Sequence, residues 1–419
     1  MPVIPLPAQV DPTEGAGSLL DAEPKVIADI SLAAEGYVLN TTDDRPTIAA
    51  ADDAGEHYAR LTLTQLTADA RAAGADRLAP LRIHDAPRFA WRGAMLDVVR
   101  HFMPVSTVLA YLDDLAALKI NRLHLHLTDD QGWRVPIASR PRLTEIGAST
   151  QVGGGGGGSY TKAEIATIVE HAAAHHIVIV PEIDLPGHTT AALTAYPELA
   201  VDGVVPEPYE GIEVGFSTLD PNNELTYAFV NDVISEVAEM FPGPWLHIGG
   251  DECLSTPEAD FLHFIERATA IVAAHGKTVI GWHEMGRSRA LPPGTIGQYW
   301  NLTTPLEVDG HGNPADHAAH VRSFTDQGGS IILSPADVAY FDIKYTEDHP
   351  IGLMWPGKPT TLEDAFGWEP TEVVPGLDEG SILGLEAPMF TETIVDLDAL
   401  RSMAFPRMAA LAELAWSPR

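Results

Sequence analysis

Cysteine is almost absent from this chain. Cys253 is the only one among 419 residues, so no disulfide can form within the chain and the composition does not call for an oxidising compartment. A run of about 18 uncharged apolar residues, the length of a membrane span, does not occur. The opening residues MPVIPLPAQVDP have neither the positive start nor the apolar run of a secretion signal, so a cytoplasmic location is expected.

Positive charge is scarce as well. Lysine and arginine together number 25, against 59 aspartates and glutamates, which gives a formal net charge of -34. A field of this sign repels phosphate backbones and anionic lipids, so nucleic acids and membrane surfaces are poor partners and a neutral or cationic ligand is favoured. We interpret the acidity chiefly as a general property of the host's proteins rather than as a device for steering substrate.

The first 87 residues differ in composition from the rest of the chain. They are rich in Ala, Asp, Thr and Pro, and their apolar runs are short. A helix is expected over Ala54–Ala73, where Tyr58 and Leu66 share a face, although Leu61–Thr64 also alternates as a strand would. We predict a small α+β accessory domain over residues 1–87.

From Arg88 to the end, short apolar runs alternate with segments of helical length. This alternation is typical of βα units built on a parallel sheet, and eight strands are the number that closes a barrel. The sequence therefore predicts a catalytic (β/α)8 barrel, a TIM barrel, over residues 88–419. The eight predicted strands are Gly93–Val99, Arg122–Leu127, Ile177–Ile183, Trp245–Ile248, Thr278–Trp282, Thr295–Trp300, Ser330–Leu333 and Ile382–Leu385.

Polar residues follow directly after these predicted strands. The carboxyl ends of barrel strands open on one face, where barrel enzymes carry their active sites. Carboxylates, an arginine and aromatic rings together suit a carbohydrate, whose C–H faces stack on rings while its hydroxyls donate to carboxylates. Hydrolysis of a glycoside also needs a carboxylic acid to protonate the leaving oxygen. The clusters include Asp97 and Arg100, Asp129 and Asp130, Asp184 and His188, Asp251 and Glu252, His283 and Glu284, Asp337 and Tyr340, and Glu386.

The adjacent pair Asp251 and Glu252 is the sharpest of these features. Neighbouring residues just past a strand point in different directions, so they do not fit the usual pair of carboxylates that flank a scissile bond. One of them can act on the glycosidic oxygen while the other touches a substituent of the sugar. An Asp-Glu dipeptide in a loop is common in acidic proteins, and by itself it would indicate nothing more.

Eight strings of residues together resemble glycoside hydrolase family 20, the β-N-acetylhexosaminidases. The resemblance implies a barrel that removes terminal β-linked N-acetylglucosamine or N-acetylgalactosamine with retention, as in chitin degradation. In that family the acetamido group of the substrate acts as the nucleophile, and no metal or cofactor takes part. The strings are WRGAMLDVVRHF (91–102), NRLHLHLTDDQGWR (121–134), PEIDLPGH (181–188), HIGGDE (247–252), GWHEM (281–285), QYW (298–300), SPADVAYFDIKY (334–345) and GLEAPMFTET (384–393).

The resemblance also implies a role for each matching residue. Glu252 corresponds to the general acid and base, Asp251 to the residue that orients the acetamido N–H, and Tyr340 to the hydroxyl that holds the acetamido oxygen. An amide that attacks its own anomeric carbon is an intramolecular nucleophile of high effective molarity. The remaining expected substrate-binding residues are Arg100, Asp342 and Glu392 for the hydroxyls, Trp282, Trp300 and Trp355 for the aromatic walls, and Asp129, His188 and Asp184 in support of the acid.

The chain departs from the family pattern in two places. Phe390 stands where the family usually has the tryptophan that forms the platform under the sugar ring, so a weaker platform is expected. In a different arrangement Phe390 would turn into the core and Trp368 would fill the platform instead. The accessory domain is also shorter than the usual one, and it carries none of the expected chemistry.

The same residues are compatible with three other functions. A metal-dependent hydrolase would use imidazoles and carboxylates at the strand ends. A carbohydrate-binding protein without catalysis would not need an acid beside the scissile oxygen. A cysteine nucleophile is conceivable at Cys253, although no partnering histidine can be inferred from spacing. The residues of the metal hypothesis are His124, His126, Asp129, His188, His247 and Asp251.

Overall fold

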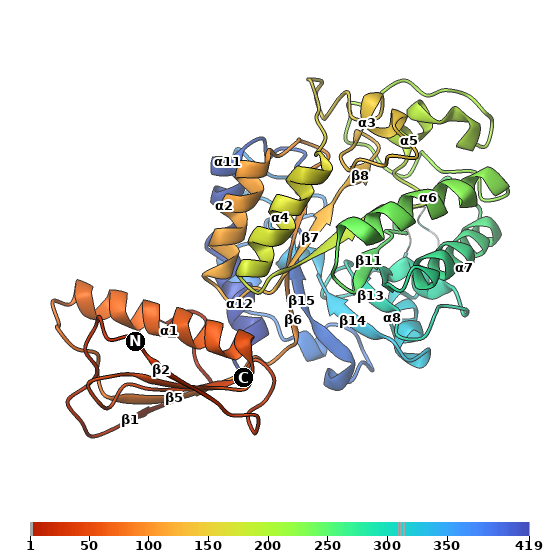
Figure 1. The fold of residues 1–419 in the computed structure, drawn as a ribbon. Coiled ribbons are helices and arrows are strands. Elements are labelled where there is room, and N and C mark those ends of the chain that lie inside the picture. The colour runs from red at the N-terminus through yellow and green to blue at the C-terminus, as the bar shows by residue number, and fades with distance from the viewer. Residues whose placement is uncertain (1–2, 309, 311, 313–314, 419) are drawn as a thin grey trace.

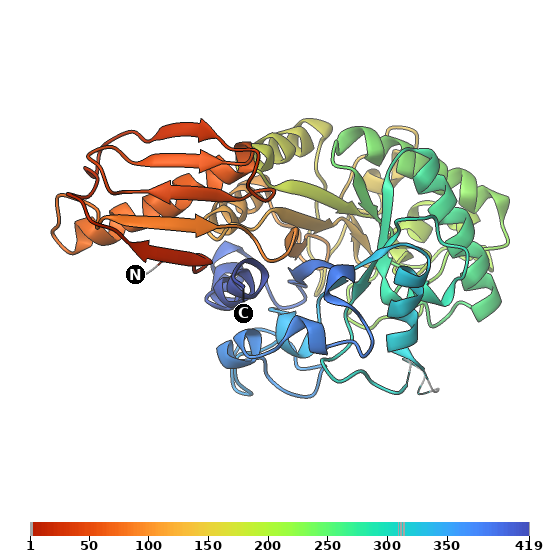
Figure 2. The same ribbon diagram turned by 90° about the horizontal axis from the view of Figure 1, so that it is seen from below.

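The computed structural model describes residues 3–308, 310, 312 and 315–418. Figure 1 shows a small sheet with one long helix at one side and a barrel ringed by helices at the other. The view from below in Figure 2 shows the strands of the small sheet lying side by side, next to the last helix of the barrel. Within the described residues, no helix has the length and apolar character needed to span a membrane.

The N-terminal sheet has five strands in the order β1-β5-β3-β4-β2, and helix α1 packs on one face of it. The side chain of Asp52 caps α1 by accepting from the backbone N–H of Gly55, and Tyr58, Thr62 and Leu66 are buried on the sheet side. The alternation at residues 61–64 therefore lies within a helix, as the wider pattern predicted. The elements are β1 (Gln9–Pro12), β2 (Lys25–Ala28), β3 (Tyr37–Asn40), β4 (Thr47–Ala50), α1 (Asp53–Ala72) and β5 (Leu81–Asp85).

Eight parallel strands close the barrel in the order β10-β11-β12-β13-β14-β15-β6-β7. They coincide with the eight predicted apolar runs to within two residues at each end, so the predicted barrel is confirmed. Such strands read as apolar runs because helices and the barrel interior bury both of their faces. Their bounds are β6 (Trp91–Asp97), β7 (Arg122–His126), β10 (Val178–Glu182), β11 (Trp245–His247), β12 (Thr278–Trp282), β13 (Ile296–Tyr299), β14 (Ser330–Leu333) and β15 (Ile382–Ala387).

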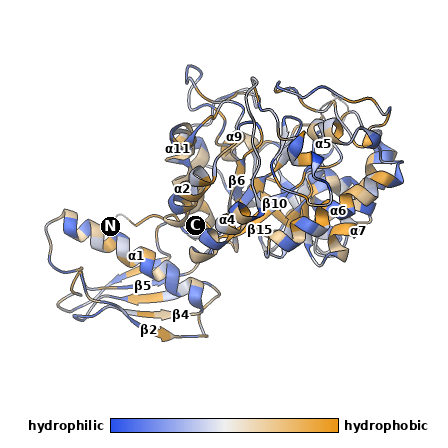
Figure 3. Cartoon of the chain, turned by 45° about the horizontal axis from the view of Figure 1, so that its top comes forward, coloured by the Kyte–Doolittle hydropathy of each residue, from blue (hydrophilic) through white to orange (hydrophobic). Residues whose placement is uncertain are grey.

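The helices around the barrel are amphipathic. In α6, for example, Phe229, Val233 and Val237 are buried, and Figure 3 shows both hydrophobic and hydrophilic colour on α6 and α7. These helices close the outer layer and leave the strand ends free to carry the site. The longer ones are α2 (Val105–Ala116), α4 (Lys162–Ala174), α6 (Glu224–Met240), α7 (Glu258–Ala274), α8 (His317–Asp326), α11 (Leu397–Ala404) and α12 (Arg407–Trp416).

The barrel interior has an apolar layer and, two residues further along the strands, a polar one. Val180 and Ile280 belong to the apolar layer, and Glu182 and Trp282 follow them on the same strands. The Glu182 carboxylate accepts from the Trp282 indole at 3.0 Å and lies 2.5 Å from Nδ1 of His126. Burial alone would raise the pKa of Glu182, but its histidine neighbours hold it well below the usual range. The ionised carboxylate of Glu182 therefore pairs with side chains of two other strands, Trp282 and His126, just below the strand ends.

A buried ion pair joins the N-terminal sheet to the barrel. Nζ of Lys119, just after α2, lies 3.0 Å from Oδ2 of Asp85 at the end of β5, and neither side chain is exposed. Asp85 also accepts from the Tyr37 hydroxyl at 2.5 Å and from the Trp416 indole at 2.9 Å. Because a buried charge is costly unless it is fully paired, this cluster fixes the small sheet against the barrel.

Replacing Asp85 by alanine should lower the free energy of unfolding by about 3–5 kcal/mol, because the Lys119 ammonium would remain buried without its partner. The matched control is Asp21→Ala, which removes an exposed pair with Arg71 and should cost about 0–1 kcal/mol. Urea denaturation of both variants measures the difference. Equal costs for the two changes would show that the buried pair does not hold the sheet in place.

Candidate active site

A cavity of about 390 Å³ opens at the carboxyl ends of the barrel strands. Eleven of the thirteen residues predicted for the site line this cavity, and they come from strand ends far apart in the sequence. Six more residues line it without having been predicted as substrate-binding: Ile212, Glu213 and Val214 on the long loop before α6, His126 at the end of β7, and Leu353 and Met354 next to Trp355. The predicted residues that line it are Arg100, Asp129, Asp184, His188, Asp251, Glu252, Trp300, Tyr340, Trp355, Phe390 and Glu392.

A turn that contains Gly249 follows β11 and positions the carboxylates of Asp251 and Glu252. Gly249 has φ +67, and a Cβ on it would lie only 1.6 Å from Oδ1 of Asp184, so no other residue fits there. Glu252 itself has φ +43, a conformation that residues other than glycine seldom adopt. The turn brings Asp251 and Glu252 to one imidazole: their oxygens lie 3.9 and 3.7 Å from Nε2 of His188.

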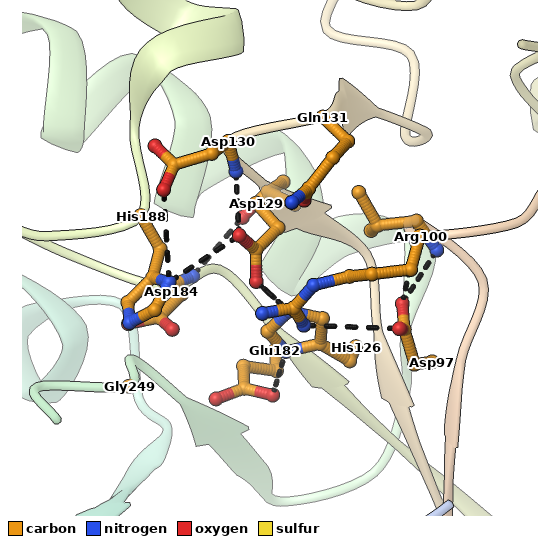
Figure 4. Close-up of polar contacts among 12 residues, drawn as sticks. Asp97, Arg100, His126, Asp129, Asp130, Gln131, Glu182, Asp184, His188 and Gly249 are labelled. Carbon is orange, nitrogen blue, oxygen red and sulfur yellow. Dashed lines mark hydrogen bonds and ion pairs between the residues drawn. The ribbon is translucent and has the colours of Figure 1, made fainter. Parts of the chain in front are cut away.

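Asp129 is the centre of a buried network of charges, shown in Figure 4. One of its oxygens lies 2.7 Å from Nη1 of Arg100 and 2.7 Å from Nε2 of His126, and the other lies 3.3 Å from Nδ1 of His188. Burial opposes ionisation, but the charges of Arg100 and His188 hold the pKa of Asp129 well below its usual range. Asp129 therefore stays ionised and gives the cavity one fixed negative charge.

His188 lies between Asp129 and the two carboxylates of the turn. Burial would lower the pKa of His188, yet Asp129, Asp184 and Asp251 raise it well above the usual value, so the ring is an imidazolium at neutral pH. Burial also raises the pKa of Glu252 to about 7; His188 opposes that rise and Asp251 adds to it. Glu252 is thus a carboxylic acid in mildly acidic solution, and it faces a cavity.

Aromatic rings form the other side of the cavity. The Tyr340 ring lies 5.5 Å from that of Trp355 and 5.7 Å from that of Phe390, and Trp300 lies 5.9 Å from Trp355. Phe390 faces the cavity, whereas Trp368 is buried elsewhere with its indole donating to the carbonyl of Ala365. The arrangement in which Trp368 replaces Phe390 as the platform therefore does not occur.

Two of the predicted residues do not line the cavity. Trp282, for which the family resemblance implied a place in the aromatic wall, lies deeper in the barrel, 1% exposed and donating to Glu182. Its position at a strand end was correct, but the sequence could not tell which layer of the interior its ring fills. Asp342 is 2% exposed, and its Oδ1 accepts from the backbone N–H of Phe390 at 3.3 Å.

Several buried polar atoms of this region have no hydrogen-bond partner among the described residues. Three of them belong to residues that line the cavity: Nε of Arg100, Nε2 of His188 and Oδ1 of Asp251. Buried polar groups are nearly always paired in folded proteins, so such atoms gathered at one cavity indicate a polar ligand. A sugar, which carries both donors and acceptors around a ring, matches this mixture of a cation and carboxylates.

The geometry does not favour a catalytic metal. His124, Glu182 and His247 could offer ligand atoms within 4.8 Å of one another, but none of the three lines the cavity. Asp184, His188 and Asp251 could do so within the cavity, and so could His126, Asp129 and Asp184. In the second group Oδ2 of Asp129 is already paired with His126 and with the Arg100 guanidinium, each at 2.7 Å, so these residues serve as a network of charged hydrogen bonds.

Cys253 does not offer a nucleophile. Burial raises the pKa of its thiol well above the usual value, and Sγ lies 3.1 Å from the carbonyl oxygen of Asp251 as a donor. A buried thiol in this state is inert, because the thiolate is the reactive form.

Comparisons with known proteins agree with the cavity's chemistry. Residues 89–419 match the model of the catalytic domain of glycosyl hydrolase family 20, and residues 20–86 match that family's domain 2. The chain is 42% identical to a β-N-acetylhexosaminidase of Cellulomonas fimi over 98% of this chain and 80% of that protein. A solved family 20 β-N-acetylglucosaminidase is 44% identical with a TM-score of 0.90, covering 99% of this chain and 91% of the other.

A second solved structure, the N-acetyl-β-hexosaminidase of Streptomyces plicatus in complex with Thio-NAglucal, is 41% identical. Its TM-score is 0.90, and the match covers 100% of this chain and 91% of that one. The match therefore includes both the small N-terminal sheet and the barrel. With a catalytic-domain model that matches most of its length and relatives above 40% identity, this chain belongs to glycosyl hydrolase family 20.

Proposed function

We propose that this chain is a retaining exo-β-N-acetylhexosaminidase that removes terminal β-linked N-acetylglucosamine or N-acetylgalactosamine. The observation that carries the proposal is the cavity in which Glu252, with a pKa of about 7, stands beside Asp251 and Tyr340. At about 390 Å³ the cavity is at the small end of ligand pockets, which suits one terminal sugar rather than a polymer passing through.

Glu252 is proposed to protonate the leaving oxygen and afterwards to accept a proton from water. The acetamido oxygen of the substrate attacks its own anomeric carbon, so the C–O bond to the aglycone breaks as a new C–O bond forms within the sugar. The product of this step is an oxazolinium ion, and water then opens it with overall retention. No second carboxylate is needed at the anomeric carbon.

Asp251 and Tyr340 are proposed to hold the acetamido group in the reactive position. Oδ1 of Asp251 has no partner among the described residues and can accept the N–H, which becomes more acidic as the cation forms. Burial, followed by the charges of Asp251 and Asp342, raises the pKa of Tyr340 well above its usual value, so its hydroxyl remains a donor for the acetamido oxygen.

Arg100 is proposed to bind the hydroxyls on the far side of the sugar, together with Asp342 and Glu392. Nη1 of Arg100 is paired with Asp129. The buried Nε of Arg100 has no partner among the described residues, so it can donate to a ligand. Trp300 and Trp355 would enclose the acetamido methyl. A carbohydrate is the partner that these groups together favour.

An aryl β-N-acetylglucosaminide should be hydrolysed, while the matching aryl β-glucoside should react very slowly, because the glucoside lacks the internal nucleophile. Release of nitrophenol from the two substrates measures this, and proton NMR of the fresh reaction should show the β-anomer first. Similar rates on both substrates would rule out assistance by the acetamido group.

Glu252→Gln and Asp251→Asn should both slow turnover, but by different routes. Loss of the general acid costs about 10²–10⁴-fold, and an aglycone that leaves easily should restore much of the loss in Glu252→Gln because it needs little protonation. Asp251→Asn should be slow with every aglycone, since the change slows the closure of the oxazolinium ring itself. A series of aryl leaving groups separates the two, and identical dependence in both variants would overturn the assigned roles.

Phe390→Trp should lower KM more than it changes kcat. The ring of Phe390 lines the cavity with the Arg100 guanidinium 5.1 Å from its centre, and a larger face should strengthen stacking by about 0.5–1.5 kcal/mol. The stacking acts on ground state and transition state alike, which is why kcat should move little. A variant with a lower Tm and an unchanged or higher KM would show that the pocket has no room for the platform.

A further inference from the structure

The mechanism proposed above makes no use of Glu284, although this carboxylate lies within reach of the cavity wall. Glu284 is in the short helical turn after β12, and its side chain is 14% exposed. The indole N–H of Trp300, which follows β13, points at this carboxylate: Nε1 lies 3.0 Å from each of its two oxygens. Trp300 lines the cavity proposed for the sugar, so Glu284 contacts the outer side of that wall.

Two imidazoles lie in a row behind Glu284. Nε2 of His317 lies 3.1 Å from the carbonyl oxygen of Val308, which fixes a proton on Nε2 and leaves Nδ1 as an acceptor. That Nδ1 lies 2.7 Å from Nε2 of His283, so His283 donates there and its own Nδ1 is an acceptor. This Nδ1 lies 3.3 Å from Oε2 of Glu284.

Burial, followed by repulsion from Asp251, raises the pKa of Glu284 to about 8, and burial with two neighbouring histidines lowers that of His283. At neutral pH Glu284 is therefore a neutral carboxylic acid. Nδ1 of His283 has no hydrogen-bond partner among the described residues, so the bond that Glu284 makes here is the one it accepts from the indole N–H of Trp300.

Trp300 lines two cavities. The second, of about 900 Å³, is also bounded by Glu252, Glu284 and Trp355. Without a fixed hydrogen bond, the Trp300 indole would have this space to move into, and the pocket around the acyl group would widen. A second contact, the ring of His283 at 5.7 Å, lies on the same side as Glu284.

We propose that Glu284 is a positioning residue, which fixes the Trp300 indole where it lines both cavities and thereby sets the length of acyl group that the enzyme accepts. This inference rests on the proposed function, because it assumes that Trp300 encloses the acyl group of the substrate. Glu284 acts through Trp300 and touches no reacting atom.

The test compares aryl glucosaminides that carry N-acetyl, N-propanoyl and N-butanoyl groups. The wild-type enzyme should prefer acetyl strongly, since each extra methylene in a fitted pocket costs about tenfold or more in kcat/KM. Glu284→Ala should reduce the ratio of acetyl to butanoyl by about tenfold, mostly through KM. Glu284→Gln should keep the wild-type ratio, because its amide oxygen still accepts the indole N–H.

Two further variants make the result decisive. Glu258→Ala is the matched control: Glu258 borders the same larger cavity but pairs with Arg287 at 2.6 Å, so the ratio should not change. Trp300→Phe keeps a ring but removes the N–H, and it should relax the ratio as Glu284→Ala does, with no further effect when the two are combined.

An unchanged acyl preference in folded Glu284→Ala would overturn the inference, as would Glu284→Gln behaving like Glu284→Ala. If Glu284→Ala fails to fold, an unchanged preference in Trp300→Phe overturns it instead. Failure of the proposed function looks different, because the wild-type enzyme would then not cleave the N-acetyl substrate at all.

Discussion

The buried ion pair between Arg100 and Asp129 is the interaction on which the site depends. Its atoms are 2.7 Å apart, and both side chains are almost fully buried. Such a pair is costly to break, because the remaining partner would be an uncompensated charge away from water. Asp129 then positions two imidazoles, and Arg100 presents its remaining donors to the cavity. The arrangement of charged hydrogen bonds at the cavity thus follows from one charge pair at the strand ends.

The same network explains how neighbouring carboxyl groups can hold different protonation states. Asp129 is surrounded by a guanidinium and an imidazolium, so it is ionised in spite of its burial. Glu252 is only partly buried, with 33% of its side chain exposed, but this burial and the neighbouring carboxyl group of Asp251 raise its pKa to about 7 although His188 opposes the change. One environment yields a fixed anion and the other a proton donor, which is the division of roles that acid catalysis at neutral pH needs.

The barrel could be predicted from the sequence for one physical reason. A parallel strand buried on both faces is a mostly apolar run, and polar residues such as Asp184 and Asp251 follow these runs, so they stood out at the strand ends. The roles of the individual site residues, Tyr340 and Glu392 among them, came instead from the family resemblance. Trp282 was harder to place, because a strand buried on both faces gives no signal for how deep a given ring will lie. Ile212–Val214 lie on a long loop without periodicity, and Glu284 acts through a contact with Trp300 that no spacing reveals.

The pH dependence of kcat/KM on an aryl N-acetylglucosaminide tests the central claim, that its surroundings keep Glu252 protonated up to neutral pH. The pKa of Glu252 is raised, so the active, protonated form should persist up to about pH 7, and kcat/KM should fall as the pH rises further. In Glu252→Gln, measured with an activated aglycone, this alkaline limb should disappear. A limb near the ordinary carboxyl value of about 4.3, or one that remains in Glu252→Gln, would contradict the account.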